Sequence, residues 1–83
     1  MKVTFEHGGA EQKMFREFYE IAQNYFDPEE TDEYWDGYID TIHNFIVGNI
    51  PLARELAKGL SNYLENELKR KRGTQYANAE QLQ

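Results

Sequence analysis

The stretch from Asp27 to Leu60 reads DPEETDEYWDGYIDTIHNFIVGNIPLARELAKGL, and its helix boundaries decide the fold. Its centre carries an apolar residue every three or four positions, which is the period of an amphipathic helix. These positions are Trp35, Tyr38, Ile39, Ile42, Phe45 and Ile46. The pair Gly48-Asn49 predicts a left-handed helix stop after Val47, and Pro51 predicts the start of a third helix. Because the connection is so short, the second and third helices should lie antiparallel.

The start of this middle helix has two interpretations. Proline disfavours a helical residue before it and is favoured at the first helical position, so Asp27 can cap a helix that begins at Pro28. Glu30, three residues after Asp27, can then complete a capping box. Alternatively, the pair Thr31-Asp32 provides a second cap, and the first two turns form a separate short helix.

Two further amphipathic segments flank the middle one. From Ala10 to Phe26 the period predicts a first helix, whose apolar face consists of Met14, Phe18, Ile21 and Tyr25, widened by Phe15, Ala22 and Phe26. The third helix has an apolar stripe of Ala53, Leu56, Ala57, Leu60, Leu64 and Leu68. Gly59 interrupts it at a cost of about 1 kcal/mol relative to Ala, so either it permits a close helix approach, which we favour, or the helix simply tolerates it. Basic residues from Lys69 to Arg72, followed by Gly73, predict its end.

Both ends of the chain lack a helical pattern. Residues 1–9 place Val3 and Phe5 on one side of a short strand or arm, which is too short for a sheet of its own. The arm should therefore lie on the helices or pair with a copy of itself. Residues 74–83 are mostly polar and predict a flexible tail. We expect an all-α fold, a three-helix antiparallel bundle over residues 10–73 with an extended arm and a polar tail.

Length and composition exclude several classes of protein. A chain of 83 residues makes one domain at most. The absence of cysteine excludes a disulfide-stapled scaffold and favours a reducing cytoplasm. No apolar run approaches the roughly 20 residues of a membrane span. With two histidines and Ser61 as the only serine, no nucleophilic triad is indicated, and we expect no enzyme activity and no cofactor.

Charge is unevenly distributed along the chain. Residues 1–40 hold eleven acidic and three basic side chains, whereas residues 41–83 hold four acidic and six basic ones. The excess of acids over what a helix start requires predicts a surface that binds a basic protein partner. The predicted binding residues are Glu29, Glu30, Asp32, Glu33, Tyr34, Trp35, Asp36, Tyr38 and Asp40. The aromatic members would supply contact area. A solvated face that only keeps the chain soluble is the alternative.

Two other sites are possible on the same helices. Asp36, Asp40 and His43 fall four and three residues apart, so they are candidate metal ligands if another helix or subunit supplies the remaining ones. The Lys69–Arg72 run is the one basic patch, but it is short and suits a helix end, so direct nucleic-acid binding is not expected. These cations are instead candidates for contact with the acidic helix start of another copy.

The chain has twelve aromatic residues, which are many for three short helices. Some rings should remain outside the core, and Tyr and Trp are enriched at interfaces. We therefore expect an aromatic surface patch and a homodimer.

From Pro28 to Leu68 the chain resembles small uncharacterised helical proteins of phages and mobile elements of Gram-positive bacteria. The resemblance rests on Thr31-Asp32-Glu33-Tyr34-Trp35 and on Asn62-Tyr63-Leu64-Glu65. It implies a phage-type accessory factor in the host cytoplasm, for instance an inhibitor of a nucleic-acid-guided defence enzyme of the anti-CRISPR kind. It assigns a role to no individual residue.

Overall fold

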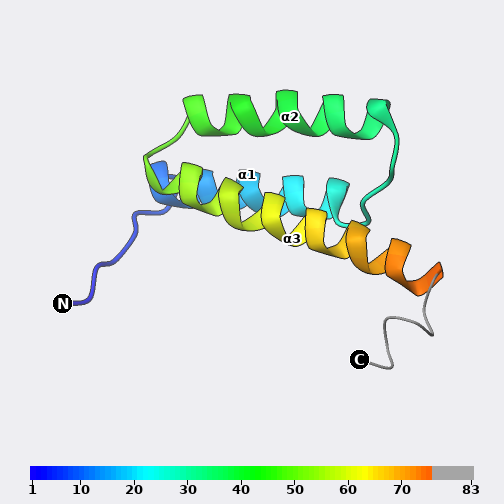
Figure 1. Ribbon diagram of the computed structural model, residues 1–83. Coiled ribbons are helices and arrows are strands. Elements are labelled where there is room, and N and C mark those ends of the chain that lie inside the picture. Colours follow the sequence, from blue (N-terminus) through cyan, green and yellow to red (C-terminus); the bar gives the residue numbers. More distant parts are fainter. Residues whose placement is uncertain (76–83) are drawn as a thin grey trace.

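The computed structural model describes residues 1–75 and shows three α-helices (Figure 1). They are α1 (Ala10–Tyr25), α2 (Asp32–Val47) and α3 (Leu52–Gln75). Helices α1 and α3 run in the same direction and α2 runs opposite to both, so the chain passes up, down and up. Each helix contacts the other two. The predicted all-α bundle and the antiparallel packing of α2 against α3 are confirmed.

The core is built from the apolar positions that the helical period identifies. Its buried members are Met14, Ile21, Tyr38, Phe45, Ala53, Leu60 and Leu64. Met14 and Leu64 are fully buried, and they come from α1 and α3. Three predicted apolar-face positions are wrong as core positions. Two of them, Phe15 and Phe26, are 39% and 57% exposed, and the third is Ile39 of α2, which is 58% exposed. It lies next to Tyr38 in the sequence, and because a helix turns about 100° per residue the two side chains face different directions.

Helix α2 begins later than the Asp27-Pro28 interpretation predicts. Its N-cap is Thr31, whose hydroxyl oxygen accepts a hydrogen bond from the Tyr34 backbone N–H at 3.2 Å. The capping box of Asp27 and Glu30 is therefore wrong, as is the alternative's separate short helix, because residues 27–31 are not helical. Both acidic side chains instead form ion pairs with the end of α3, where Lys71 contacts Asp27 and Arg72 contacts Glu30.

The end of α2 also differs from the prediction. Gly48 has a φ of −88°, so the helix stops without a left-handed residue. Hydrogen bonds from polar side chains hold the end of α2 instead. The Asn49 amide donates to the carbonyl oxygen of Phe45 and to a Glu17 carboxylate oxygen, both at 2.9 Å, and the Lys13 ammonium donates to the Gly48 carbonyl at 3.1 Å. The hydrogen bond from Asn49 and the contact with Lys13 lower the pKa of Glu17.

Helix α3 continues past the predicted stop at Gly73 and reaches Gln75. The first two residues of the predicted 74–83 tail are therefore helical, and residues 76–83 lie outside the described part of the chain. Gly59 does not mediate a close helix approach within the chain, because a Cβ built on it meets nothing within 4 Å. The interpretation of Gly59 as an intramolecular contact point is wrong.

The N-terminal residues form an arm rather than a strand, and the first residues point away from the helices (Figure 1). A turn ends it, in which Gly8 takes a positive φ of 78° and the Gly9 N–H donates to the Glu6 carbonyl at 2.9 Å. Within the described residues the arm makes one aromatic contact, in which Phe5 stacks on Phe15 of α1 with centroids 6.0 Å apart. Val3 remains exposed.

Candidate functional site

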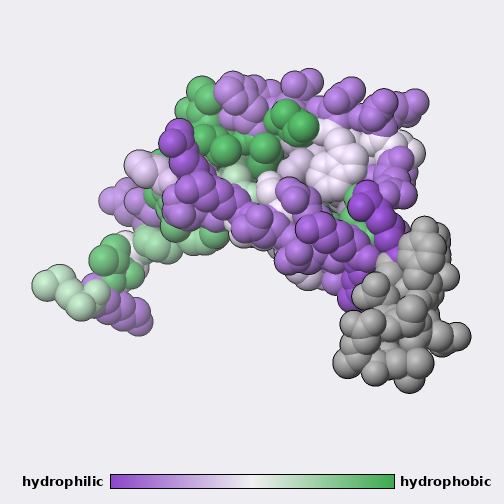
Figure 2. Space-filling model, viewed as in Figure 1, coloured by the Kyte–Doolittle hydropathy of each residue, from purple (hydrophilic) through white to green (hydrophobic). Residues whose placement is uncertain are grey.

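Four carboxylates share one side of α2. Asp32, Asp36 and Asp40 follow at steps of four residues, so each lies about 6 Å further along the helix, and Glu33 extends the group sideways. We call these four residues the acidic face. All four are exposed. Figure 2 shows hydrophilic side chains along the outer edge of α2. Among residues 1–75, no ion pair includes a member of the acidic face.

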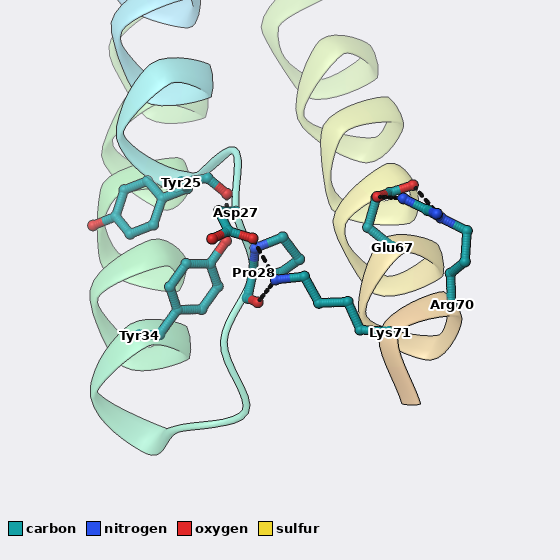
Figure 3. Close-up of polar contacts among 7 residues, drawn as sticks. All are labelled: Tyr25, Asp27, Pro28, Tyr34, Glu67, Arg70 and Lys71. Atoms are coloured by element: carbon teal, nitrogen blue, oxygen red, sulfur yellow. Dashed lines mark hydrogen bonds and ion pairs between the residues drawn. The ribbon is translucent and has the colours of Figure 1, made fainter. Parts of the chain in front are cut away.

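The remaining predicted acidic residues lie in the connection between α1 and α2. Glu30 is paired with Arg72 of α3, whereas Glu29 is exposed without an ion pair in the described part of the chain. Lys71 reaches the same connection, where its ammonium contacts Asp27 and donates to the Pro28 carbonyl at 2.9 Å (Figure 3). The basic end of α3 therefore meets the acidic connection of its own chain, which corrects the prediction that it meets another copy.

The predicted aromatic anchors are parts of the bundle. Tyr38 is only 2% exposed, and its hydroxyl lies 2.7 Å from the Ser61 hydroxyl of α3. Tyr34 donates its hydroxyl to the Tyr25 carbonyl at 2.5 Å, as Figure 3 shows. The rings of Tyr34 and Trp35 meet edge to face at 4.8 Å, and both residues are half-buried. Tyr38 is therefore wrong as a contact residue, and Tyr34 and Trp35 offer only part of their surfaces.

Burial has a measurable consequence at these tyrosines. Because the phenolate charge is poorly solvated beside α1, burial raises the pKa of Tyr34 to about 12, with smaller contributions from the neighbouring Tyr38 and Tyr25. Burial also raises the pKa of Tyr38, partly offset by the hydrogen bond with Ser61. Both hydroxyls therefore stay protonated across the physiological range, so neither tyrosine is poised for proton transfer.

Sequence reasoning missed the apolar neighbour of the acidic face, which is Ile39. With Trp35 and with Leu68 of α3 it lines an open groove of about 350 Å³, whose rim includes Lys69. A signal for its exposure was present in the sequence. The six apolar residues from Trp35 to Ile46 fall within an arc of about 120° around the helix, and Ile39 lies at one edge of that arc, next to Asp32 and Asp36.

The three metal candidates do not form a site on their own. Asp36, Asp40 and His43 are all exposed on α2. In residues 1–75 no group of three or more His, Cys, Asp or Glu side chains is arranged to hold a metal ion. The described part of the chain supplies no further ligand near them, so the metal hypothesis gains no support from the geometry.

Comparison with known protein families, curated proteins and solved structures finds no match to this chain. None of the helices in the described residues combines the length and the apolar character that crossing a membrane requires. The physical features of the acidic face are therefore the basis for a functional proposal.

Proposed function

We propose that the protein is a non-enzymatic interaction module whose acidic face binds the basic surface of a partner protein. The observation that carries this proposal is a set of four exposed carboxylates on one side of α2 that no cation of the described residues neutralises. Ile39, exposed at the edge of this face, adds apolar contact area.

Fold stability accounts for only part of the acidic face. Asp32 and Glu33 lie in the first turn of α2, where the helix dipole stabilises a negative charge by about 0.3–1 kcal/mol. Asp36 and Asp40 lie beyond that turn, so the dipole effect there is small. Four carboxylates on one face also repel each other, because like charges four residues apart destabilise a helix. A basic partner would relieve this repulsion.

The chemistry of the face suggests a class of partner. A row of negative charges at intervals of about 6 Å suits a surface rich in Lys and Arg, such as one that binds nucleic-acid phosphates. Electrostatic attraction would speed the encounter and would make it sensitive to salt. Occupation of such a surface would compete with nucleic acid, so we propose an inhibitory role of the phage type that the sequence resemblance implies.

Affinity purification from the native cell tests the proposal. The bait is either the wild-type chain or the triple variant Asp32→Lys, Asp36→Lys and Asp40→Lys. The matched control variant carries Glu6→Lys, Glu11→Lys and Glu20→Lys, which change the net charge equally at acids of the arm and of α1, away from the acidic face and the groove beside it. We expect wild type and control to retain the same basic protein and the acidic-face variant to lose it. Equal retention by all three baits would contradict the proposal.

A further inference from the structure

A second surface lies on the side of the bundle away from α2, where α1 and α3 are neighbours. Each helix contributes four residues at steps of four, three and four. We call these eight residues the aromatic face: Phe15, Tyr19, Ala22 and Phe26 with Leu52, Leu56, Gly59 and Tyr63. Five of its six bulky side chains are exposed, with Tyr19 at 64% and Phe26 at 57%. Monomeric proteins rarely expose so much contiguous apolar surface unless it binds something.

The two stripes are side by side and in register. The rings of Phe26 and Tyr63 stack with centroids 5.4 Å apart. Because α1 and α3 run in the same direction, equal steps back along each helix pair the other levels. Ala22 then lies level with Gly59, and Phe15 lies level with Leu52. The aromatic face is therefore low at the level of Ala22 and Gly59, with bulky side chains on both sides of that level.

Gly59 is the residue that the isolated chain does not explain. It lies in the interior of α3, where glycine costs about 1 kcal/mol relative to alanine. Nothing lies within 4 Å of a Cβ built on it, so an alanine would fit without a clash. A glycine at the low middle of an exposed apolar face does allow the backbone of another helix to approach closely. No helix of residues 1–75 makes that approach.

Charge identifies a second copy as the partner. Arg16 flanks the aromatic face on the outer edge of α1, and Glu55 flanks it on the outer edge of α3. Glu55 also forms an exposed ion pair with Lys58 of its own helix at 3.6 Å, which is worth little in water and leaves the carboxylate accessible. Phe15 is level with Leu52, Arg16 follows Phe15 by one residue, and Glu55 follows Leu52 by three. The two charged residues are therefore offset along the helix axis by the rise of two residues, or about 3 Å. A two-fold axis parallel to the helices lays α1 of one copy over α3 of the other. Arg16 then meets Glu55 of the other copy, twice.

We propose that two copies of the chain pair through the aromatic face in this two-fold arrangement, with the helices crossing closely at Gly59. The arrangement places α2 of each copy on the outside. The two acidic faces then point away from each other, so pairing of two chains that each carry a net charge of −6 avoids their strongest mutual repulsion. The dimer is independent of the proposed function, and both acidic faces remain free for a partner.

Sedimentation equilibrium of the full chain at micromolar concentration tests the proposal. The wild-type chain should sediment at twice its mass of 9.8 kDa. Tyr19→Lys should raise the dimer dissociation constant by about tenfold or more, because it places a charge in the centre of the apolar contact. Val47→Lys introduces the same charge at a 70% exposed apolar position on α2, so it is the matched control and should leave the dimer intact.

A charge exchange tests the identity of the partner. Arg16→Glu alone should weaken the dimer, because it places two carboxylates opposite each other at each of the two contacts, and Glu55→Arg alone should do the same with two cations. The double variant should restore wild-type association. Circular dichroism confirms that each variant keeps its helices. A wild-type chain that stays at 9.8 kDa, equal losses in Tyr19→Lys and Val47→Lys, or a double variant without recovery would each overturn the proposal.

Discussion

The hydroxyl pair of Tyr38 and Ser61 allows a sharp test of how α2 is fixed to α3. Tyr38 is 2% exposed, and its hydroxyl lies 2.7 Å from the Ser61 hydroxyl. The pair joins the two helices at the centre of the bundle. Ser61→Ala leaves the tyrosine hydroxyl buried without its partner, whereas Tyr38→Phe removes the hydroxyl itself.

The expected losses of stability differ, because removing a hydrogen bond costs less than leaving a buried polar group without a partner. Tyr38→Phe should lower the free energy of unfolding by about 0.5–1.5 kcal/mol, the net value of one hydrogen bond. Ser61→Ala should lower it by about 1–3 kcal/mol, because a buried hydroxyl is left unsatisfied. In the double variant neither polar group remains, so the loss should be smaller than the sum of the single losses by about 1 kcal/mol.

Urea unfolding followed by circular dichroism measures all four proteins at one fixed concentration, which keeps any self-association constant. For a domain of this size, 1 kcal/mol corresponds to a shift of about 4–8 °C in Tm, so thermal scans provide an independent check. Losses that simply add in the double variant would show that the two hydroxyls do not interact, and would refute the packing of α2 on α3 described above.

Three further changes test separate parts of the fold. Lys71→Ala removes the donor to the Pro28 carbonyl and should speed proteolysis of the α1–α2 connection, with a loss of stability below about 1 kcal/mol; Lys69→Ala is the control, and equal cleavage rates would contradict the role of Lys71. Burial raises the pKa of Tyr34 from 10.0 to about 12, so its contribution to stability is complete below pH 10.0 and is lost as pH rises through about 12. Tyr34→Phe should reduce that alkaline loss in urea unfolding, and an unchanged pH profile would refute it. In the Tyr19→Lys background, which weakens the dimer, Gly59→Ala should raise the free energy of unfolding by about 1 kcal/mol. A lowered Tm in that background would show that the space around the Cβ position of Gly59 is not open.

The helices themselves were predictable because their information is local. Apolar spacing alone identified α1 and most of the core, since positions such as Met14 and Leu64 repeat with the helical period. The turn at Pro51 was equally predictable, because a proline so soon after the end of α2 allows only a short connection to the next helix.

Several of the errors involve partners distant in the sequence. Asp27 resembles a helix cap until Lys71, 44 residues later, is known to contact it. Tyr38 resembles an interface residue until Ser61 provides a buried partner for its hydroxyl. Gly59 predicted a close approach of helices, but no neighbouring helix among the described residues comes within 4 Å of its Cβ position.

The candidate site was predictable in its charges and not in its aromatic residues. The acidic face needed only the spacing of Asp32, Asp36 and Asp40, which a helix converts into one surface. Which neighbouring rings turn inward depends on the packing of α1 and α3, and local sequence does not encode it.

The most direct test of the acidic face is a titration of the retained partner with the fluorescently labelled chain at increasing salt. Fluorescence anisotropy would compare the wild type with the triple variant Asp32→Asn, Asp36→Asn and Asp40→Asn, which removes charge with little change in size. The wild type should bind much more weakly at about 500 mM than at about 50 mM salt, and the triple variant should bind weakly at both. Equal affinity and equal salt dependence of the two proteins would contradict the assignment of function to the acidic face.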